Sequence, residues 1–155
     1  MTGKLKHFID LDSFSKKDFR SLLDSCHDRK NSKIRHGKAE VDIDACAEDK
    51  ILAMIFEKPS TRTRISFDIA AKQLGGSSII LNPDGIHYGK GDESLKDTAR
   101  VLTEYVDIVM LRTSSHKNLE EFGKYLDIPI INGLSDISHP CQIMASIMAI
   151  EEKIG

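Results

Sequence analysis

The sequence ILAMIFEKPSTRTR, residues 51–64, carries the clearest structural signal in the chain. Its first six residues are apolar on both faces of an extended strand, as is typical of a strand buried in a parallel sheet. Pro59 cannot continue a strand ladder, and Ser60 belongs to the residue types that cap helices. A helix is predicted after Ser60, because an apolar stripe follows and ends at the glycine pair 75–76: Phe67, Ala70, Ala71 and Leu74.

The same order of strand and helix recurs along the rest of the chain. Apolar strands are predicted at residues 77–81, 107–111 and 128–131, each before an amphipathic helix, the last of which starts near His139. A helix at 16–29, with a Ser15 to Asp18 capping pattern, and a polar connector at 30–50 precede the first strand. Residues 1–155 are therefore predicted to form one α/β domain, a doubly wound sandwich with a parallel sheet of about four strands and helices on both faces.

The composition excludes several classes of protein. With 155 residues, of which 40% are hydrophobic and 30% charged, the chain is neither collagen-like, coiled-coil nor disordered. Its 22 basic and 24 acidic residues give a net charge of −2, so we expect no nucleic-acid partner. No apolar run approaches the roughly 18 residues of a membrane span, and the first ten residues lack the apolar core of a signal peptide. We expect a cytoplasmic protein without a membrane partner.

Donors for an anion cluster directly after the first predicted strand. In sheets of this kind, ligands bind beyond the carboxyl ends of the strands. Unpaired N–H groups of a helix start, hydroxyls and a guanidinium suit a tetrahedral oxyanion such as phosphate. The alternative interpretation is a capped helix with solvated arginines. The candidate ligands are Ser60, Thr61, Arg62 and Thr63, whereas Arg64, about 200° further around the helix, is expected to pair with Asp68.

Further candidates follow the third and fourth predicted strands. Arg112 ends the third strand, and Asn132 and Gly133 are read as the loop beyond the fourth. His139 precedes a proline suited to a first helical turn, and its ring can donate to a carbonyl oxygen. Gln142, one turn later, presents an amide that can read another amide. His139 can equally be an ordinary capping or core histidine, and Cys141 is expected to pack as a small hydrophobe rather than act as a nucleophile.

The loop at residues 82–94 is long, polar and rich in glycine, as in functional lids. Its Gly-Lys-Gly sequence does not fit the phosphate-binding pattern GxxxxGK[ST], so a Walker-type ATPase is excluded. Neither HExxH, nor zinc-spaced Cys and His residues, nor GxGxxG occurs, and no metal or other cofactor is expected. The last predicted helix is apolar on more than one face, which favours a partner surface outside these residues.

Four motifs in order resemble the aspartate/ornithine carbamoyltransferase family: FEKPSTRTR at 56–64, DTARVL at 97–102, INGL at 131–134 and HPCQ at 139–142. Lys58, and Thr113-Ser114 after Arg112 where aspartate enzymes usually have His-Pro, resemble the ornithine type. The sequence departs from the family pattern at Ser146 and Ala149, where an Asp and a Thr are usual.

The resemblance implies roles for the candidate residues. Ser60 to Thr63 would hold the phosphate of carbamoyl phosphate, and three side chains would address its carbamoyl group: Arg112, His139 and Gln142. The amine of ornithine would attack the carbamoyl carbon to give citrulline and phosphate, a reaction of arginine metabolism. Arg62, Arg112 and His139 would be catalytic through stabilisation of developing charge.

The resemblance also implies a larger assembly. Family members are about twice as long, and their second domain binds the amino acid, so residues 1–155 are expected to be the carbamoyl-phosphate half and inactive alone. First domains associate as homotrimers, in which His87 or Lys90 of the 82–94 loop would enter a neighbour's site. Two alternatives remain open: a carbamoyltransferase for another amine, such as putrescine or aspartate, and a stand-alone, non-catalytic module that binds phosphate or carbamoyl phosphate.

Overall fold

A computed structural model describes residues 7–33, 37–38, 40–82 and 95–154. In this part of the chain, four parallel strands form one sheet in the order β2-β1-β3-β4, which confirms the predicted α/β architecture. The elements in chain order are η1 (Leu11–Ser13), α1 (Lys16–Lys33), β1 (Ile51–Phe56), α2 (Thr61–Gln73), β2 (Ser77–Leu81), α3 (Leu95–Tyr105), β3 (Ile108–Arg112), α4 (His116–Tyr125), β4 (Ile130–Leu134) and α5 (Pro140–Ile154).

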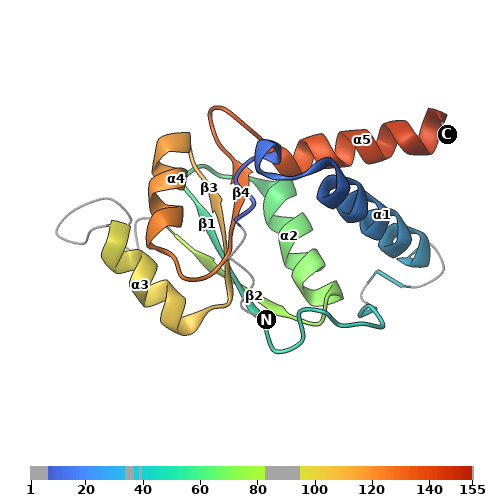
Figure 1. Ribbon diagram of the computed structural model, residues 1–155. Helices are drawn as coiled ribbons and strands as arrows, with labels where there is room; N and C mark the ends of the chain where they lie inside the picture. Colours follow the sequence, from blue (N-terminus) through green and yellow to red (C-terminus); the bar gives the residue numbers. More distant parts are fainter. Residues whose placement is uncertain (1–6, 34–36, 39, 83–94, 155) are drawn as a thin grey trace.

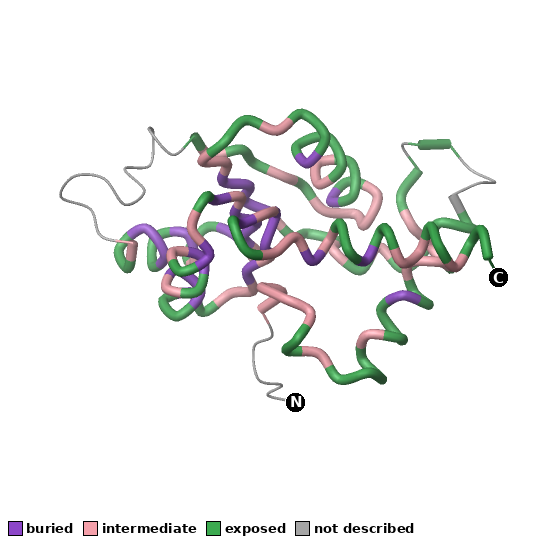
Figure 2. Tube along the Cα trace, turned by 90° about the horizontal axis from the view of Figure 1, so that it is seen from above, coloured by how far each residue is buried: buried purple, intermediate pink, exposed green. Residues whose placement is uncertain are grey.

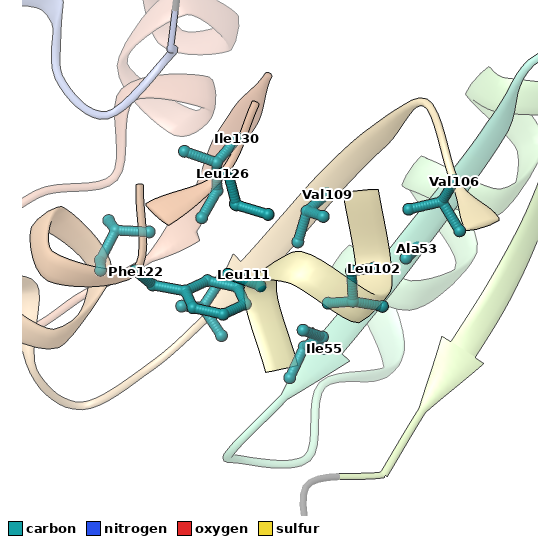
Figure 3. Packing of buried hydrophobic residues seen from close by; sticks show 11 residues of the cluster. Ala53, Ile55, Leu102, Val106, Val109, Leu111, Phe122, Leu126 and Ile130 are labelled. Atoms are coloured by element: carbon teal, nitrogen blue, oxygen red, sulfur yellow. The ribbon is translucent and has the colours of Figure 1, made fainter. Parts of the chain in front are cut away.

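Helices cover the two faces of the sheet, as Figure 1 shows: α3 and α4 lie on one side, and α2, with α1 and α5, on the other. Successive residues of β1 point to opposite faces. Ala53 and Ile55 belong to the larger core cluster, shown in Figure 3, which α3 and α4 close. Leu52 and Met54 pack with Ala71 of α2 in the smaller cluster. Buried residues accordingly gather in the middle of the molecule in Figure 2.

Two predicted boundaries were wrong. α1 continues to Lys33 rather than ending near residue 29, and Lys30 in this extra turn reaches α5, where its Nζ lies 2.6 Å from Glu152 Oε2. β4 runs from Ile130 to Leu134 rather than over 128–131, so Asn132 and Gly133 belong to the strand and not to a loop.

Tertiary contacts explain the polar residues inside β4. Asn132 is fully buried, and its Nδ2 donates to the carbonyl oxygens of Ile9 (3.0 Å) and Ser138 (3.2 Å). Gly133 is closely packed, because a Cβ there would lie 2.3 Å from Met110 Sδ and the Met110 side chain would have to move. Between β3 and β4 the register is irregular at this point: Leu111 pairs with Asn132, but Arg112 pairs with Leu134.

The two edges of the sheet differ. The backbone of Phe8 bridges to β4, since Phe8 N donates to Ile130 O and Asn132 N donates to Phe8 O, both at 2.8 Å. On the outer strand β2, Ile79 and Ile80 remain 41% and 37% exposed, so helix coverage thins at this side.

Ion pairs join α1 to α5. Arg20 Nη1 donates to Glu151 Oε1 at 2.5 Å, and His27 Nε2 lies 2.8 Å from Glu151 Oε2. These hydrogen bonds, that from Arg20 first, lower the pKa of Glu151 to about 2. Three isoleucines of α5 are also exposed, in keeping with its apolar sequence: Ile143, Ile150 and Ile154. Within the described residues, no helix has the length and hydropathy needed to cross a membrane.

Candidate functional site

The start of α2 lies beyond the carboxyl end of β1. Ser60 caps the helix as predicted, because its Oγ accepts a hydrogen bond from Thr63 N at 3.3 Å. Thr61 and Arg62 form an exposed first turn, whereas Thr63 is buried. The first N–H groups of a helix lack intrahelical partners and carry partial positive charge, so this turn is suited to an anion.

Arg112 connects the end of β3 to this helix start. It pairs with Phe56 in the sheet register, and its Nη1 donates to Thr63 Oγ1 at 3.1 Å. The sequence prediction that the third strand brings a guanidinium to the first loop therefore agrees with the geometry. Arg112 Nε is buried and has no hydrogen-bond partner in the described part of the chain. An unpaired buried donor of this kind needs an acceptor, and a bound ligand is one way to provide it.

His139 lies immediately before α5 and near Arg112. Burial lowers the pKa of its imidazole, and the positive charge of Arg112 lowers it further, so the ring is neutral at pH 7. Its Nδ1 is buried and, like Arg112 Nε, unpaired among the described residues. The two side chains thus offer unsatisfied polar atoms from two different elements beside a cationic helix start.

Hydrogen bonds within residues 135–138 fix the loop that leads to His139. Ser135 N donates to Ser138 O at 3.0 Å, and Ser135 Oγ accepts from Ser138 N at 3.1 Å. Ser135 Oγ also lies 2.8 Å from Nδ1 of His116, a buried histidine of α4. Sequence reasoning did not find Ser135 or His116, because neither belongs to a recognisable motif and their contact joins residues 19 positions apart.

Glu57 is a third residue to which the sequence reasoning gave no role. Its Oε2 accepts from Thr113 Oγ1 at 2.7 Å and from Ser114 N at 3.1 Å, and its backbone N donates to Arg112 O at 2.9 Å. The available signal was a carboxylate placed directly before a run of cationic and hydroxyl side chains. The loop after β1 is thereby fastened to the residues that follow Arg112.

Gln142 is exposed in the first turn of α5. Its Nε2 lies 3.5 Å from Ser146 Oγ, the only side-chain hydrogen bond of Gln142 within the described residues. No hydrogen bond joins its side-chain amide to Arg112 or His139 in the described part of the chain, although its backbone N donates to His139 O at 3.0 Å. His87 and Lys90 lie outside the described residues.

The remaining sequence candidates have structural roles. The described residues show no direct ion pair between Arg64 and Asp68. The direct partners of Asp68 are Lys72 Nζ at 2.9 Å and Ser78 Oγ, which donates at 2.5 Å. The hydrogen bond from Ser78 lowers the pKa of Asp68 most, and the charge of Arg64 also contributes. Burial raises the pKa of the Cys141 thiol to about 11, so it stays protonated, as expected of a packing residue. No group of three or more His, Cys, Asp or Glu side chains in the described ranges is placed to hold a metal ion.

Comparison with known proteins shows which proteins share this fold. Residues 6–152 match the family described as "Aspartate/ornithine carbamoyltransferase, carbamoyl-P binding domain". The chain belongs to this family. One relative is the ornithine carbamoyltransferase of Caulobacter vibrioides. It is 51% identical to this chain, and the alignment covers 97% of this chain and 48% of the relative.

Solved structures of carbamoyltransferases share the fold. The ornithine carbamoyltransferase of Pyrococcus furiosus superimposes with a TM-score of 0.87 at 41% identity, over 97% of this chain and 46% of that one. A variant of N-acetyl-L-ornithine transcarbamylase, solved with carbamyl phosphate and N-succinyl-L-norvaline, has a TM-score of 0.83 at 29% identity, over 97% and 49%. The chain thus spans about half the length of the relatives it matches, and the resemblance predicted from the four motifs is confirmed.

Proposed function

We propose that residues 1–155 are the carbamoyl-phosphate-binding half of an ornithine carbamoyltransferase. The complete enzyme transfers the carbamoyl group from carbamoyl phosphate to ornithine and releases citrulline and phosphate. The observation that carries this proposal is the pair of buried nitrogens on Arg112 and His139 that have no hydrogen-bond partner among the described residues and lie beside the exposed first turn of α2. Together they suit a ligand with an anionic end and a carbonyl end.

The phosphate end would lie at the first turn of α2. The backbone N–H groups there, the hydroxyls of Ser60, Thr61 and Thr63, and the Arg62 guanidinium supply the donors and the positive charge. Thr63 already contacts Arg112, so phosphate bound at this turn would lie within reach of both guanidiniums. Arg62 would stabilise the phosphate as it departs.

The carbamoyl end would face Arg112 and His139. As the acceptor amine attacks the carbamoyl carbon, negative charge develops on the carbonyl oxygen, and donors already aimed at that position lower the barrier. Arg112 Nε and the His139 ring are the available donors, with Thr63 nearby. Gln142 would have to turn from Ser146 to address the carbamoyl NH₂. The tetrahedral intermediate then collapses with loss of phosphate, and no covalent bond to the protein is needed.

The acceptor and the assembly belong to the complete protein. The names of the relatives support ornithine, which places the reaction in arginine biosynthesis. N-acetyl-L-ornithine transcarbamylase shares this half at 29% identity, so a different amine acceptor is the second candidate. A cytoplasmic homotrimer, with His87 or Lys90 entering a neighbour's site, completes the proposal and is supported by the family resemblance alone.

The test compares two neighbouring arginines. Arg62→Ala is expected to weaken binding of inorganic phosphate about ten- to a hundredfold, because a charge-assisted hydrogen bond contributes roughly 1.5–3 kcal/mol. Arg64→Ala removes the same charge from the other side of α2 and is expected to change the affinity less than about threefold. Isothermal titration calorimetry measures both. Equal affinities for wild type and Arg62→Ala would contradict the assignment.

A further inference from the structure

We infer that Glu57 is a positioning residue, which holds the Arg112 guanidinium in place at the start of α2 by anchoring Thr113 and Ser114. The inference rests on the proposed function, in which Arg112 faces the carbamoyl group. It adds a residue that itself contacts neither end of the ligand in that arrangement.

Glu57 makes hydrogen bonds to the end of β3 through both its backbone and its side chain. The backbone N–H donates to Arg112 O at 2.9 Å, which continues the β1–β3 ladder by one bond. Oε2 accepts from Thr113 Oγ1 at 2.7 Å and from Ser114 N at 3.1 Å, and lies 3.5 Å from Ser114 Oγ. One half-buried carboxylate oxygen thus collects three donors from the two residues after Arg112.

The strand needs this anchor because its other side is irregular. Between β3 and β4 the register shifts between Leu111 and Arg112, and Gly133 of β4 has no paired residue in β3. Such a bulge re-aims the neighbouring side chain and weakens the ladder that would otherwise fix it. The direction of Arg112 therefore depends on what holds the backbone directly after it, and Thr113 is held there by Glu57 and by Leu134 O at 3.0 Å.

A carboxylate next to an anion site is otherwise unfavourable. If Glu57 acted only through its charge, its removal would strengthen binding of every anion, and Glu57→Gln would behave like Glu57→Ala. If Glu57 acts through its hydrogen bonds, glutamine keeps an acceptor oxygen for Thr113 and Ser114, whereas alanine removes it. The two variants therefore separate charge from position.

The choice of ligand separates positioning from general damage. Inorganic phosphate draws most of its donors from the start of α2 and reaches Arg112 as one donor among several, whereas the carbamoyl end of carbamoyl phosphate depends on Arg112 and His139. We expect Glu57→Ala to lower the affinity for carbamoyl phosphate about tenfold and that for inorganic phosphate less than about threefold, because it removes the charge-assisted hydrogen bonds that hold Thr113 and Ser114. Glu57→Gln is expected to stay within about threefold of wild type for both ligands.

The experiment titrates freshly dissolved carbamoyl phosphate and inorganic phosphate into wild type, Glu57→Ala, Glu57→Gln and Thr113→Val by calorimetry, with thermal unfolding of each variant as a check on folding. Thr113→Val removes the partner hydroxyl and should show the same selective loss. The double variant with Glu57→Ala and Thr113→Val should bind carbamoyl phosphate no more than about threefold more weakly than Glu57→Ala alone, because both substitutions remove the same Glu57–Thr113 hydrogen bond. Glu48→Ala, at the other end of β1, removes an equal charge and should change neither affinity.

The outcomes distinguish this inference from the function on which it rests. Wild type that binds neither ligand would overturn the proposed function and the inference with it. Wild type that binds both, with a Glu57→Ala variant that loses both equally or gains affinity, would overturn the positioning role alone. Should Glu57→Ala fail to fold, unchanged carbamoyl phosphate binding by folded Thr113→Val would have the same meaning.

Discussion

The starts of α2 and α4 are alike in local structure and opposite in use. Each follows the carboxyl end of a central strand, and each has a serine cap: Ser60 Oγ accepts from Thr63 N at 3.3 Å, and Ser115 Oγ from Asn118 N at 3.2 Å. At α4, however, His116 N also donates to Asp136 Oδ1 at 2.7 Å. A carboxylate from the loop after β4 thus occupies the position that an external anion would take.

The two helix starts differ in the side chain that another part of the chain places beside each of them. The α4 start receives a carboxylate, and its first residue, His116, is buried against Ser135. The α2 start receives the Arg112 guanidinium and leaves Thr61 exposed. A serine cap after a buried strand therefore marks a helix start in both places, and the partner from elsewhere in the chain decides whether an external anion can also bind there.

The largest effect is expected when the start of α2 is given a carboxylate, as the start of α4 has in Asp136. Thr61→Asp places a carboxylate in the first turn of α2, where it should favour the helix slightly and repel phosphate, lowering phosphate affinity by more than about tenfold. Calorimetric titration and thermal unfolding measure the two effects. Asn118→Asp, in the first turn of α4, is the matched control and should leave phosphate binding unchanged. Phosphate binding that survives in Thr61→Asp would place the anion elsewhere.

A second pair of variants sharpens the comparison at the caps. Ser60→Ala and Ser115→Ala should each lower the free energy of unfolding by about 1 kcal/mol, the usual cost of losing a helix cap. Only Ser60→Ala should also weaken phosphate binding. Urea unfolding without ligand and phosphate titration separate the two properties. A Ser115→Ala variant that binds phosphate as weakly as Ser60→Ala would show that the two starts are not independent.

The smallest expected effect is that of His139, beside the start of α2, on the pH dependence of stability. Because burial and Arg112 lower its pKa in the folded protein, the unfolded chain takes up this proton first as the pH falls. Stability is thus present above about pH 6.5 and is lost as the pH falls toward the lowered value. His139→Gln should reduce the loss between pH 7.5 and 5.5 by less than about 1 kcal/mol, since the ring is only half-buried.

Urea unfolding at a series of pH values measures this difference. His7, whose pKa is also lowered by burial, remains in both proteins and accounts for part of the residual slope. An identical pH profile in wild type and His139→Gln would mean that His139 is solvated like a model histidine.

Local patterns predicted the elements that depend on local chemistry. Residues 51–56 were recognisable because β1 is buried on both faces, and Ser60 because its cap involves a residue three positions later. β4 was misplaced, since Asn132 looks like a loop residue until Ile9 and Ser138 accept its protons. The sequence does not reveal such distant partners.

The site shows the same division. The helix start and Arg112 could be predicted, because each follows a strand whose carboxyl end faces a known edge of the sheet. Arg64 acts on Asp68 through its charge without direct contact, because Lys72, at an equivalent helical spacing, and Ser78 of β2 take the hydrogen bonds of the carboxylate. Glu57 was missed because its role depends on a partner 56 residues away.

The bridge from Phe8 to β4 has a practical consequence for expression of this protein. The two hydrogen bonds of Phe8 and the carbonyl of Ile9 satisfy polar groups of Ile130 and Asn132. An expression clone that begins after residue 9 would leave those groups without their partners and expose a strand edge able to pair with other chains. An amino-terminal purification tag therefore belongs ahead of residue 7, with Phe8 and Ile9 retained.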